Sequence, residues 1–359
     1  MVKIFAGFIL IYFIIIGNPL IGQEIHFIDK IPVSQKECII EMDSGIAILP
    51  GDFFIICDGR AGDLKIFDRN GKYIKKFGRR GEGPDEFATP RLYDYSDSNI
   101  LINDWRKNKI FVYTIINDLE LKLKEEFLGT CFDSKILSDG YLISGSKADK
   151  KENWYRLYIE YPRNREYSFL LTTEEMFNIQ AEGMFISNSN QLEEQANIGH
   201  RAYCDYLGDH VYAAWEGLLS IIQLNTNTRK ITRYKEKSPL YKKPVISNEL
   251  VLAKKERNQN KYTQELNKYS MIRKLFVSNK YIGIVYMNYD SKSDMLNPIV
   301  QIYSLDGKFL VEKKLENITY PNNLLSMYYD KTNNILYALS LMINEQSESQ
   351  YTLVRYGIR

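Results

Sequence analysis

Two acidic and two basic residues recur at equivalent places in the first third of the chain. Asp58 and Asp104 each follow a short apolar run, and Arg60 and Arg106 lie two residues further on. At the mouth of a polar channel, such carboxylate and guanidinium groups would hold an anion, a sugar or a peptide. The alternative is that each Asp accepts backbone N–H bonds in the turn after its strand. The repetition favours this structural role, because a turn recurs in every repeat whereas a ligand site rarely does.

A glycine-rich segment between these positions, Phe77–Phe87 (FGRRGEGPDEF), carries further candidates. Arg79, Arg80 and Glu86 are available for ion pairs or for contact with a ligand. The glycine spacing does not match a dinucleotide-binding fingerprint, because no helix follows it, and the Gly-Lys-Ser/Thr of a phosphate-binding loop is absent. The segment is interpreted first as a connector between repeats and second as a binding loop.

The sequence contains no recognisable catalytic constellation. It has no Gly-x-Ser-x-Gly nucleophile elbow, and its three histidines lack metal-binding spacing. Oxygen ligands that could surround a divalent metal in a channel are Asp58, Asn103, Asp104 and Asp205, but nothing in their spacing marks them as ligands. Trp105 would stack on a sugar ring or pack against a peptide if its indole is exposed. We therefore expect no cofactor and no metal.

Composition and charge narrow the class of protein. The 359 residues include 47 Lys and Arg against 45 Asp and Glu, so the net charge of +2 provides no strong field to recruit nucleic acid. Hydrophobic residues make up 45% of the chain and charged residues 26%, as in an ordinary globular protein. Aromatic residues reach 13%, which favours a sheet-rich fold.

The N-terminus has the pattern of an export signal. Lys3 is the only charged residue before Glu24, and the residues from Ile4 to Gly17 are uncharged and mostly apolar. A signal peptide needs an apolar run of about 7–15 residues, whereas a bilayer span needs about 20. We predict a signal peptide over residues 1–22 and a domain over residues 23–359 that is periplasmic, extracellular or on the cell surface. The alternative is an inner-membrane anchor over residues 4–22.

The chain has four cysteines, Cys38, Cys57, Cys131 and Cys204, and no Cys-x-x-Cys pair. In an exported protein they could form disulfides, with three pairings open. Free thiols are the favoured interpretation, because Cys57 ends an apolar run in which a buried thiol packs as a small hydrophobic group.

An internal repeat predicts the fold. A turn followed by a short apolar strand recurs six times, a second strand follows each time, and five of the six repeats continue into a third strand. We assign each opening run to the innermost strand of its repeat. The opening runs are 53–56, 100–102, 141–143, 210–214, 281–285 and 335–338.

The sixth repeat ends with the chain at Arg359 and has no third strand, while the alternating segment 24–31 belongs to no repeat. If the N-terminal strand completes the last sheet, the ring closes and no edge is left exposed. The predicted fold is all-β, a six-bladed β-propeller closed by its N-terminal strand and forming one domain. Two polar stretches, 174–206 and 247–275, do not fit the blades. The second is predicted to be an amphipathic helical insertion capped by Ser247.

The segment Phe77–Phe87, with Pro90 after it and the strand ending Ile102-Asn103-Asp104, resembles the TolB-like and NHL-like six-bladed propellers. It is most similar to the exported family abundant in Bacteroidetes, although Asp85 stands where that family usually has Gly. The resemblance implies the same ring and an extracytoplasmic location, and it implies little about activity.

Two functional hypotheses follow from these observations. The first is an extracytoplasmic, non-catalytic binding or scaffold propeller, expected to be monomeric, that recognises a protein, peptide or glycan at the disc face or channel mouth. The second is a metal-assisted hydrolase or lyase with its site in the central channel, by analogy with other propellers. A channel mouth lined by Arg and Tyr would favour binding, whereas convergent carboxylate or amide oxygens would favour the enzyme. Contact with a membrane is expected only if the N-terminal segment is retained.

Overall fold

The structure is a computed structural model of the chain, and it describes residues 24–146, 156–162, 166–172, 201–235, 238–242, 247–290, 295–318, 326–343 and 349–359. The predicted signal peptide, Trp154, His200 and most of the stretch 174–206 lie outside the described residues. No helix among the described residues is long and apolar enough to cross a bilayer.

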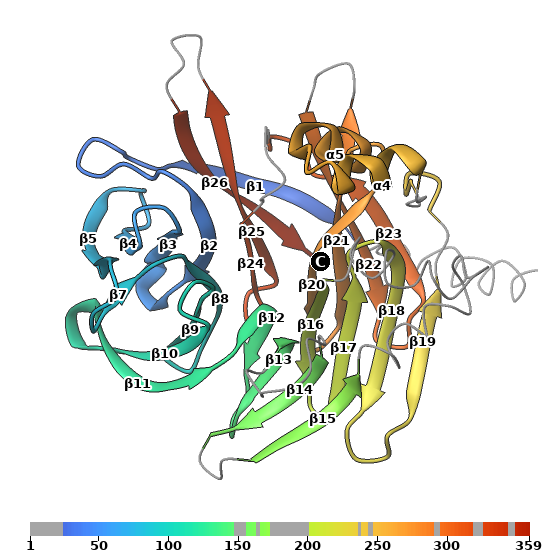
Figure 1. Cartoon of the computed structure of the whole chain (residues 1–359), viewed down its shortest axis with the longest axis horizontal. Coiled ribbons are helices and arrows are strands. Elements are labelled where there is room, and N and C mark those ends of the chain that lie inside the picture. Colours follow the sequence, from blue (N-terminus) through green and yellow to red (C-terminus); the bar gives the residue numbers. More distant parts are fainter. Residues whose placement is uncertain are drawn as a thin grey trace, which may run out of the picture.

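The described residues form six four-stranded antiparallel sheets, which are the blades of a propeller (Figure 1). Blade 1 contains β2 (Asp43–Ile48), β3 (Phe54–Asp58), β4 (Asp63–Phe67) and β5 (Tyr73–Phe77). Blade 2 contains β8 (Pro90–Ser96), β9 (Asn99–Asp104), β10 (Lys109–Ile116) and β11 (Glu120–Leu128). Blade 3 contains β12 (Thr130–Ile136), β13 (Tyr141–Ser146), β14 (Arg156–Tyr161) and β15 (Glu166–Thr172).

The second half of the ring repeats this order. Blade 4 contains β16 (Ala202–Leu207), β17 (His210–Trp215), β18 (Leu218–Asn225) and β19 (Ile231–Lys235). Blade 5 contains β20 (Met271–Val277), β21 (Tyr281–Asp290), β22 (Met295–Ser304) and β23 (Phe309–Lys314). Blade 6 contains β24 (Met327–Asp330), β25 (Ile335–Ile343), β26 (Ser349–Ile358) and, from the other end of the chain, β1 (Ile25–Pro32). Two short 3₁₀ turns, Pro50–Asp52 and Asn117–Leu119, precede β3 and β11.

The first strand of each blade lies at the centre of the ring. β2, β8, β12 and β16 contact one another in sequence, β16 contacts β20, and β24 contacts β2 (Figure 1). The approach is close enough to constrain sequence at Gly45 in β2, which has a φ of 134°. A Cβ atom at this position would lie 2.1 Å from the carbonyl oxygen of Leu92 in β8. Glycine is therefore required where these two inner strands meet.

This arrangement corrects the strand assignment made from the sequence. The six apolar opening runs belong to β3, β9, β13, β17, β21 and β25, which are the second strands of their blades and not the innermost ones. The apolar runs stand out because second strands are buried on both faces between neighbouring blades. The true innermost strands precede each turn and were missed. The number of repeats, six, is nevertheless as predicted.

The N-terminal strand is the outermost strand of blade 6. β1 pairs antiparallel with β26, from Ile25 opposite Ile358 to Pro32 opposite Thr352, with a bulge between Phe27 and Asp29. At the end of this ladder, Glu24 and Arg359 exchange two backbone hydrogen bonds of 3.0 Å each. Strands from the two ends of the chain therefore share one sheet.

Apolar side chains between neighbouring blades hold the ring together. The cluster between blades 1 and 2 includes Ile55, Leu64 and Ile102, all of them inaccessible to solvent. Phe87 from the glycine-rich connector is buried in the same cluster, with its ring 5.8 Å from that of Phe111. Burial of each such side chain contributes about 1.5–3 kcal/mol to folding. Phe87 thus fills space between the two blades that the connector joins.

The insertion before blade 5 contains two short helices where one was predicted. α4 (Asn248–Lys255) and α5 (Gln259–Leu266) pack against each other (Figure 1). Ser247 caps α4 as predicted, since its hydroxyl accepts a hydrogen bond of 3.1 Å from the backbone N–H of Leu250. Residues 271–275, assigned from the sequence to the helical insertion, begin β20 instead.

Candidate functional site

The inner strands carry polar side chains at positions where their ladders are irregular. Bulges occur between Leu92 and Asp94 in β8, between Cys131 and Asp133 in β12, and between Ile272 and Lys274 in β20. A bulge turns a side chain away from the regular alternation of a strand. Polar residues can therefore face the channel from strands that are otherwise packed into the blades.

Carboxylates that are buried or mostly buried link neighbouring inner strands around the channel. Asp94 of β8 accepts a hydrogen bond of 2.9 Å from the backbone N–H of Ile136 in β12. Asp133 of β12 accepts one of 3.0 Å from Cys204 in β16, and Asp205 of β16 accepts one of 2.7 Å from Val277 in β20. The same device, a carboxylate that binds the next blade, thus recurs at three consecutive junctions. These carboxylates position the inner strands.

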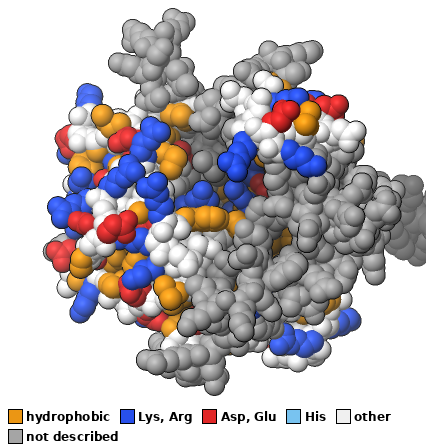
Figure 2. Space-filling model, viewed as in Figure 1, with side chains coloured by type: hydrophobic (Ala, Val, Ile, Leu, Met, Phe, Trp, Pro, Cys, Tyr) orange, Lys and Arg blue, Asp and Glu red, His pale blue; other side chains and the backbone are white. Residues whose placement is uncertain are grey.

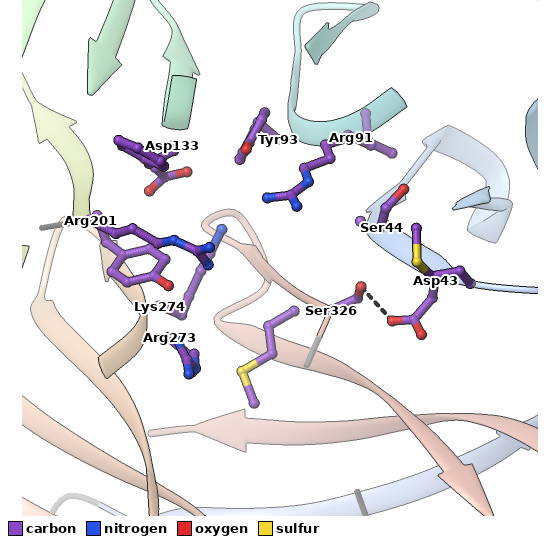
Figure 3. Close-up of a pocket in the computed structure, with 15 residues that line it drawn as sticks. Asp43, Ser44, Arg91, Tyr93, Asp133, Arg201, Arg273, Lys274 and Ser326 are labelled. Atoms are coloured by element: carbon purple, nitrogen blue, oxygen red, sulfur yellow. Dashed lines mark hydrogen bonds between the residues drawn. The ribbon is translucent and has the colours of Figure 1, made fainter. Parts of the chain in front are cut away.

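The beginnings of the inner strands enclose a cavity of about 170 Å³ at the mouth of the channel (Figure 3). Every blade contributes to its wall. We call this cavity the channel mouth, and its lining residues are Met42, Asp43, Ser44, Gly45, Arg91, Leu92, Tyr93, Phe132, Asp133, Arg201, Tyr203, Arg273, Lys274, Ser326 and Met327. Lys and Arg side chains are also visible near the centre of the molecular face shown in Figure 2.

Four basic and two acidic side chains line the channel mouth. The basic groups are Arg91, Arg201, Arg273 and Lys274, and Figure 3 shows the heads of Arg91 and Arg201 directed into the cavity. Neither Arg91 nor Arg201 forms an ion pair with a carboxylate among the residues that the structure describes. Arg273 pairs with Glu216, but its buried Nε finds no hydrogen-bond partner within the same described residues. The channel mouth therefore presents guanidinium N–H donors that can bind an anion.

The two carboxylates of the channel mouth are engaged with the protein. Asp43 accepts a hydrogen bond of 2.7 Å from the hydroxyl of Ser326, drawn as a dashed line in Figure 3. Asp133 accepts two backbone N–H bonds, from Ser134 and from Cys204. Burial raises the pKa of the Asp133 carboxyl, and this outweighs the nearby charges of Lys135 and Lys274 that favour its ionised form. Among the described residues, neither of these acids forms an ion pair with Arg91 or Arg201.

Aromatic rings support the two arginines. The guanidinium carbon of Arg91 lies 4.9 Å from the ring centre of Trp105, and that of Arg201 lies 5.9 Å from the ring centre of Phe132. Cation–π contacts of this kind hold a guanidinium group in place without neutralising it. The partly exposed Trp105 indole packs against Arg91 and against Phe132, with the ring centres of Trp105 and Phe132 5.3 Å apart, and its stacking on a sugar or peptide stays a prediction.

The two aspartates predicted from the sequence bind backbone amides. Asp58, which has no solvent exposure, accepts hydrogen bonds from the N–H groups of Glu41, Met42, Arg60 and Ala61. Its carboxylate also pairs with Lys65 at 2.8 Å. Although burial opposes its ionisation, the N–H donors and Lys65 lower the pKa of Asp58.

Asp104 also binds backbone amides, in blade 2. Its carboxylate accepts hydrogen bonds from the N–H groups of Ala88, Thr89, Arg106 and Lys107. The structural role that the repetition favoured therefore accounts for both carboxylates. Asp58 and Asp104 lie on the second strands of their blades, one strand away from the inner strands that line the channel mouth. Asp58 is opposite Asp43 in the β2–β3 ladder, and Asp104 is opposite Pro90 in the β8–β9 ladder.

The remaining predicted residues lie near the same end of blades 1 and 2. Arg79 and Arg80 form the two-residue strand β6 (Arg79–Arg80), which pairs in parallel with β7 (Glu86–Phe87). Arg79 and Glu86 form an ion pair of 2.7 Å at the surface, and Arg60 approaches Glu41 at 4.0 Å. The side chains of Arg80 and Arg106 are exposed. None of these four arginines lines the channel mouth, and their role in binding stays a prediction.

The residues considered from the sequence as oxygen ligands of a metal do not gather around one point among the described residues. Asn103 bonds the backbone of Lys109, Gly129 and Cys131, and Asp205 bonds the backbone of blades 4 and 5. The described residues contain no group of three or more His, Cys, Asp or Glu side chains arranged to hold a metal ion. The four cysteines are unbridged, and Cys57 is fully buried.

The arginines of the channel mouth were missed in the sequence, although a signal exists. Arg91-Leu92-Tyr93 at the start of blade 2 and Arg201-Ala202-Tyr203 at the start of blade 4 share an Arg-x-Tyr spacing. Both segments precede the turn and apolar run of their repeat. Aligning the repeats upstream of their turns would have shown this shared spacing.

Comparison with known protein families agrees with the architecture. Residues 25–297 match the DUF5128 family, described as a six-bladed beta-propeller. The chain belongs to this family. The match covers most of the chain, and the structure continues the DUF5128 ring through the rest of blade 5 and through blade 6. No curated protein is significantly similar to the chain.

Two solved structures share the fold of this DUF5128 propeller at low sequence identity. A member of the DUF4221 family from Bacteroides vulgatus is 13% identical, with a TM-score of 0.63 over 94% of this chain and 99% of that chain. A protein from Bacteroides fragilis whose name describes it as exported is 15% identical, with a TM-score of 0.55 over 95% of this chain and 98% of that chain. The predicted relationship to the Bacteroidetes propeller family is confirmed, whereas the TolB-like or NHL-like subtype stays a prediction.

Proposed function

We propose that this propeller is an extracytoplasmic, non-catalytic binding module that recognises a protein, peptide or glycan by taking an anionic group of it into the channel mouth. The observation that carries the proposal is the pair Arg91 and Arg201, which point into one cavity from blades 2 and 4 without a carboxylate partner among the described residues. Two guanidinium groups that point into one cavity repel each other unless a negative charge compensates them. An anion from the ligand would supply that compensation.

The size of the channel mouth limits what can enter. A cavity of about 170 Å³ accommodates a group the size of one side chain or one sugar acid, and not a folded domain. The rest of a larger ligand would lie on the face of the disc. Arginine forks match the planar carboxylate especially well, because two parallel N–H donors reach its two oxygens. A carboxylate-bearing terminal group is therefore the best fit.

An extracytoplasmic location is part of the proposal. It is supported by the signal-like pattern of residues 1–22 and by the Bacteroides fragilis neighbour described as exported. No observation on the described residues favours the alternative of a metal-assisted hydrolase or lyase, which stays an untested prediction. The Arg and Tyr side chains of the channel mouth are the feature that the binding hypothesis requires.

We expect the double variant R91Q/R201Q to lose affinity for acidic ligands. Each charge-assisted hydrogen bond contributes about 1.5–3 kcal/mol, so each single variant should bind about tenfold or more weakly and the double variant about 100-fold. Isothermal titration calorimetry should compare oligogalacturonate with neutral maltohexaose, and a peptide with a free C-terminus with its amide.

The matched control is R69Q, because Arg69 is an exposed arginine in the turn after β4, outside the channel mouth. Its affinity should equal that of the wild type. Equal loss of affinity in R69Q and R91Q/R201Q would contradict the proposal, as would acidic and neutral probes that bind equally well.

A further inference from the structure

Lys274 is a buried amine in the wall of the channel mouth. Only 8% of the residue is accessible to solvent, and it enters the cavity from β20 immediately after the bulge at Ile272 (Figure 3). Within the described ranges, its ammonium group makes no hydrogen bond or ion pair. A buried lysine usually has a carboxylate partner, because an uncompensated buried charge is costly. Lys274 is therefore a group that the binding role described above leaves unused.

The charged groups around Lys274 are largely occupied by other partners. Those that face it from β8, β12, β16 and β20 and from the residue before β16 are Asp94, Asp133, Lys135, Asp205, Arg201 and Arg273. Asp94 bonds Lys135 at 3.4 Å, and Asp205 bonds Lys331 at 2.6 Å. Burial, followed by the nearby charge of Lys135, lowers the pKa of Lys274 to about 8. A substantial fraction of the amine is thus unprotonated in mildly alkaline solution.

An unprotonated lysine amine in the wall of a cavity is a nucleophile toward carbonyl carbon. Arg91 and Arg201 line the same cavity and can hold a carboxylate. A small molecule that carries a carbonyl group beside a carboxylate would present its carbonyl carbon inside a cavity of about 170 Å³ that also contains the amine. The channel mouth thus combines a carboxylate anchor and an amine nucleophile.

We propose that Lys274 captures a 2-oxo acid, or the 2-oxo acid end of a larger ligand, as a reversible imine while Arg91 and Arg201 hold its carboxylate. This deepens the proposed function and depends on it. The lysine lone pair forms the new C–N bond, and the carbonyl π electrons move to oxygen, which gains a proton. The nitrogen then gives up the two protons of the neutral amine, the oxygen leaves as water with two protons in total, and a C=N bond remains. No oxidant or reductant takes part.

The test uses the full-length protein with pyruvate as the probe and sodium cyanoborohydride to trap the imine. Reduction should increase the protein mass by that of pyruvic acid less one oxygen atom, and peptide mapping should place the adduct on Lys274. The initial trapping rate should rise as the pH increases through about 8, because the neutral amine is the reacting form. Lactate, which has the same carboxylate but no ketone, should give no adduct.

Two variants and one independent readout separate the possible outcomes. K274R should lose the adduct at least tenfold, whereas K280R, at an exposed lysine before β21, should behave as the wild type. Protection of Arg91 and Arg201 from phenylglyoxal by lactate reports carboxylate binding alone. If lactate protects the arginines but pyruvate is not trapped on Lys274, the imine is wrong and the binding function stands. Adducts spread evenly over surface lysines would also overturn the imine. If lactate gives no protection and no adduct forms, both proposals are wrong.

Discussion

Removal of β1 should abolish most of the stability of the protein. A chain lacking residues 1–32 loses the outer strand of blade 6, with the β26 ladder and the buried side chain of Ile25. It also loses the ion pair of Asp29 with Arg355 and the bond from Lys313 to the carbonyl of Ile25. Loss of a buried Ile side chain alone costs about 2–5 kcal/mol, and each net ladder hydrogen bond about 1 kcal/mol. The sum is comparable with the whole stability of a typical domain, about 5–15 kcal/mol.

Urea unfolding followed by circular dichroism measures this effect. The reference is a chain lacking only residues 1–23, which retains β1 and separates the effect of the strand from that of the apolar N-terminus. A synthetic peptide of residues 24–33 added to the truncated chain should restore part of the lost stability, because it supplies the missing strand to the free edge of β26. Equal unfolding midpoints for the two chains would show that closure by β1 does not stabilise the ring.

The second large effect is expected for Asp205, because one carboxylate connects three blades. It accepts backbone N–H bonds from Tyr206 in blade 4 and Val277 in blade 5, and it pairs with Lys331, which follows β24 of blade 6, at 2.6 Å. The residue is 1% exposed. Removing one partner of a buried charged network costs about 3–5 kcal/mol. D205A should therefore lower the free energy of unfolding by about that amount, and D205N by less, because an amide oxygen still accepts hydrogen bonds.

The control for this prediction is D209A, since Asp209 lies in the exposed turn just after β16. An exposed substitution of this kind usually changes stability by less than about 0.5 kcal/mol. The free energies of unfolding of the three variants can be compared in urea at neutral pH. If D205A and D209A proved equally mild, the carboxylates between the inner strands would not hold the blades together.

The pKa of Asp205 predicts how the stability of the protein changes in acid. Burial opposes ionisation of Asp205, but Lys331 and Lys135 outweigh it and lower the pKa of this carboxyl in the folded protein. An acid whose pKa is lower in the folded than in the unfolded state stabilises the fold fully above the unfolded pKa, about 3.9. That stabilisation is lost as the pH falls from there toward the folded pKa. The stability difference between wild type and D205N should therefore shrink below about pH 4.

Local signals in the sequence predicted much of the fold. Turns followed by apolar runs gave six blades, because second strands are buried on both faces and their composition shows it. The alternating segment 24–31 and the missing last strand together predicted that β1 joins blade 6. Ser247 was identified as a helix cap from its position alone. Each of these features depends on a few consecutive residues.

The channel mouth could not be predicted in the same way, for two physical reasons. The inner strands place Asp133 and Lys274 among apolar residues, and bulges beside these positions break the alternation by which a strand is usually recognised. The cavity also gathers residues from all six blades, from Met42 to Met327, so no local segment contains it. Asp58 and Asp104 were found because they repeat, and they repeat because they cap turns.

Anomalous diffraction from a crystal soaked in selenate would test the central claim, that the channel mouth accepts an anion, most directly. The account predicts a selenium peak inside the mouth, with its oxygens within hydrogen-bond distance of Arg91 and Arg201. The peak should be absent from a crystal of R91Q/R201Q grown and soaked in the same way. Selenate bound only at other surfaces, or equally occupied in the wild type and the variant, would contradict the claim.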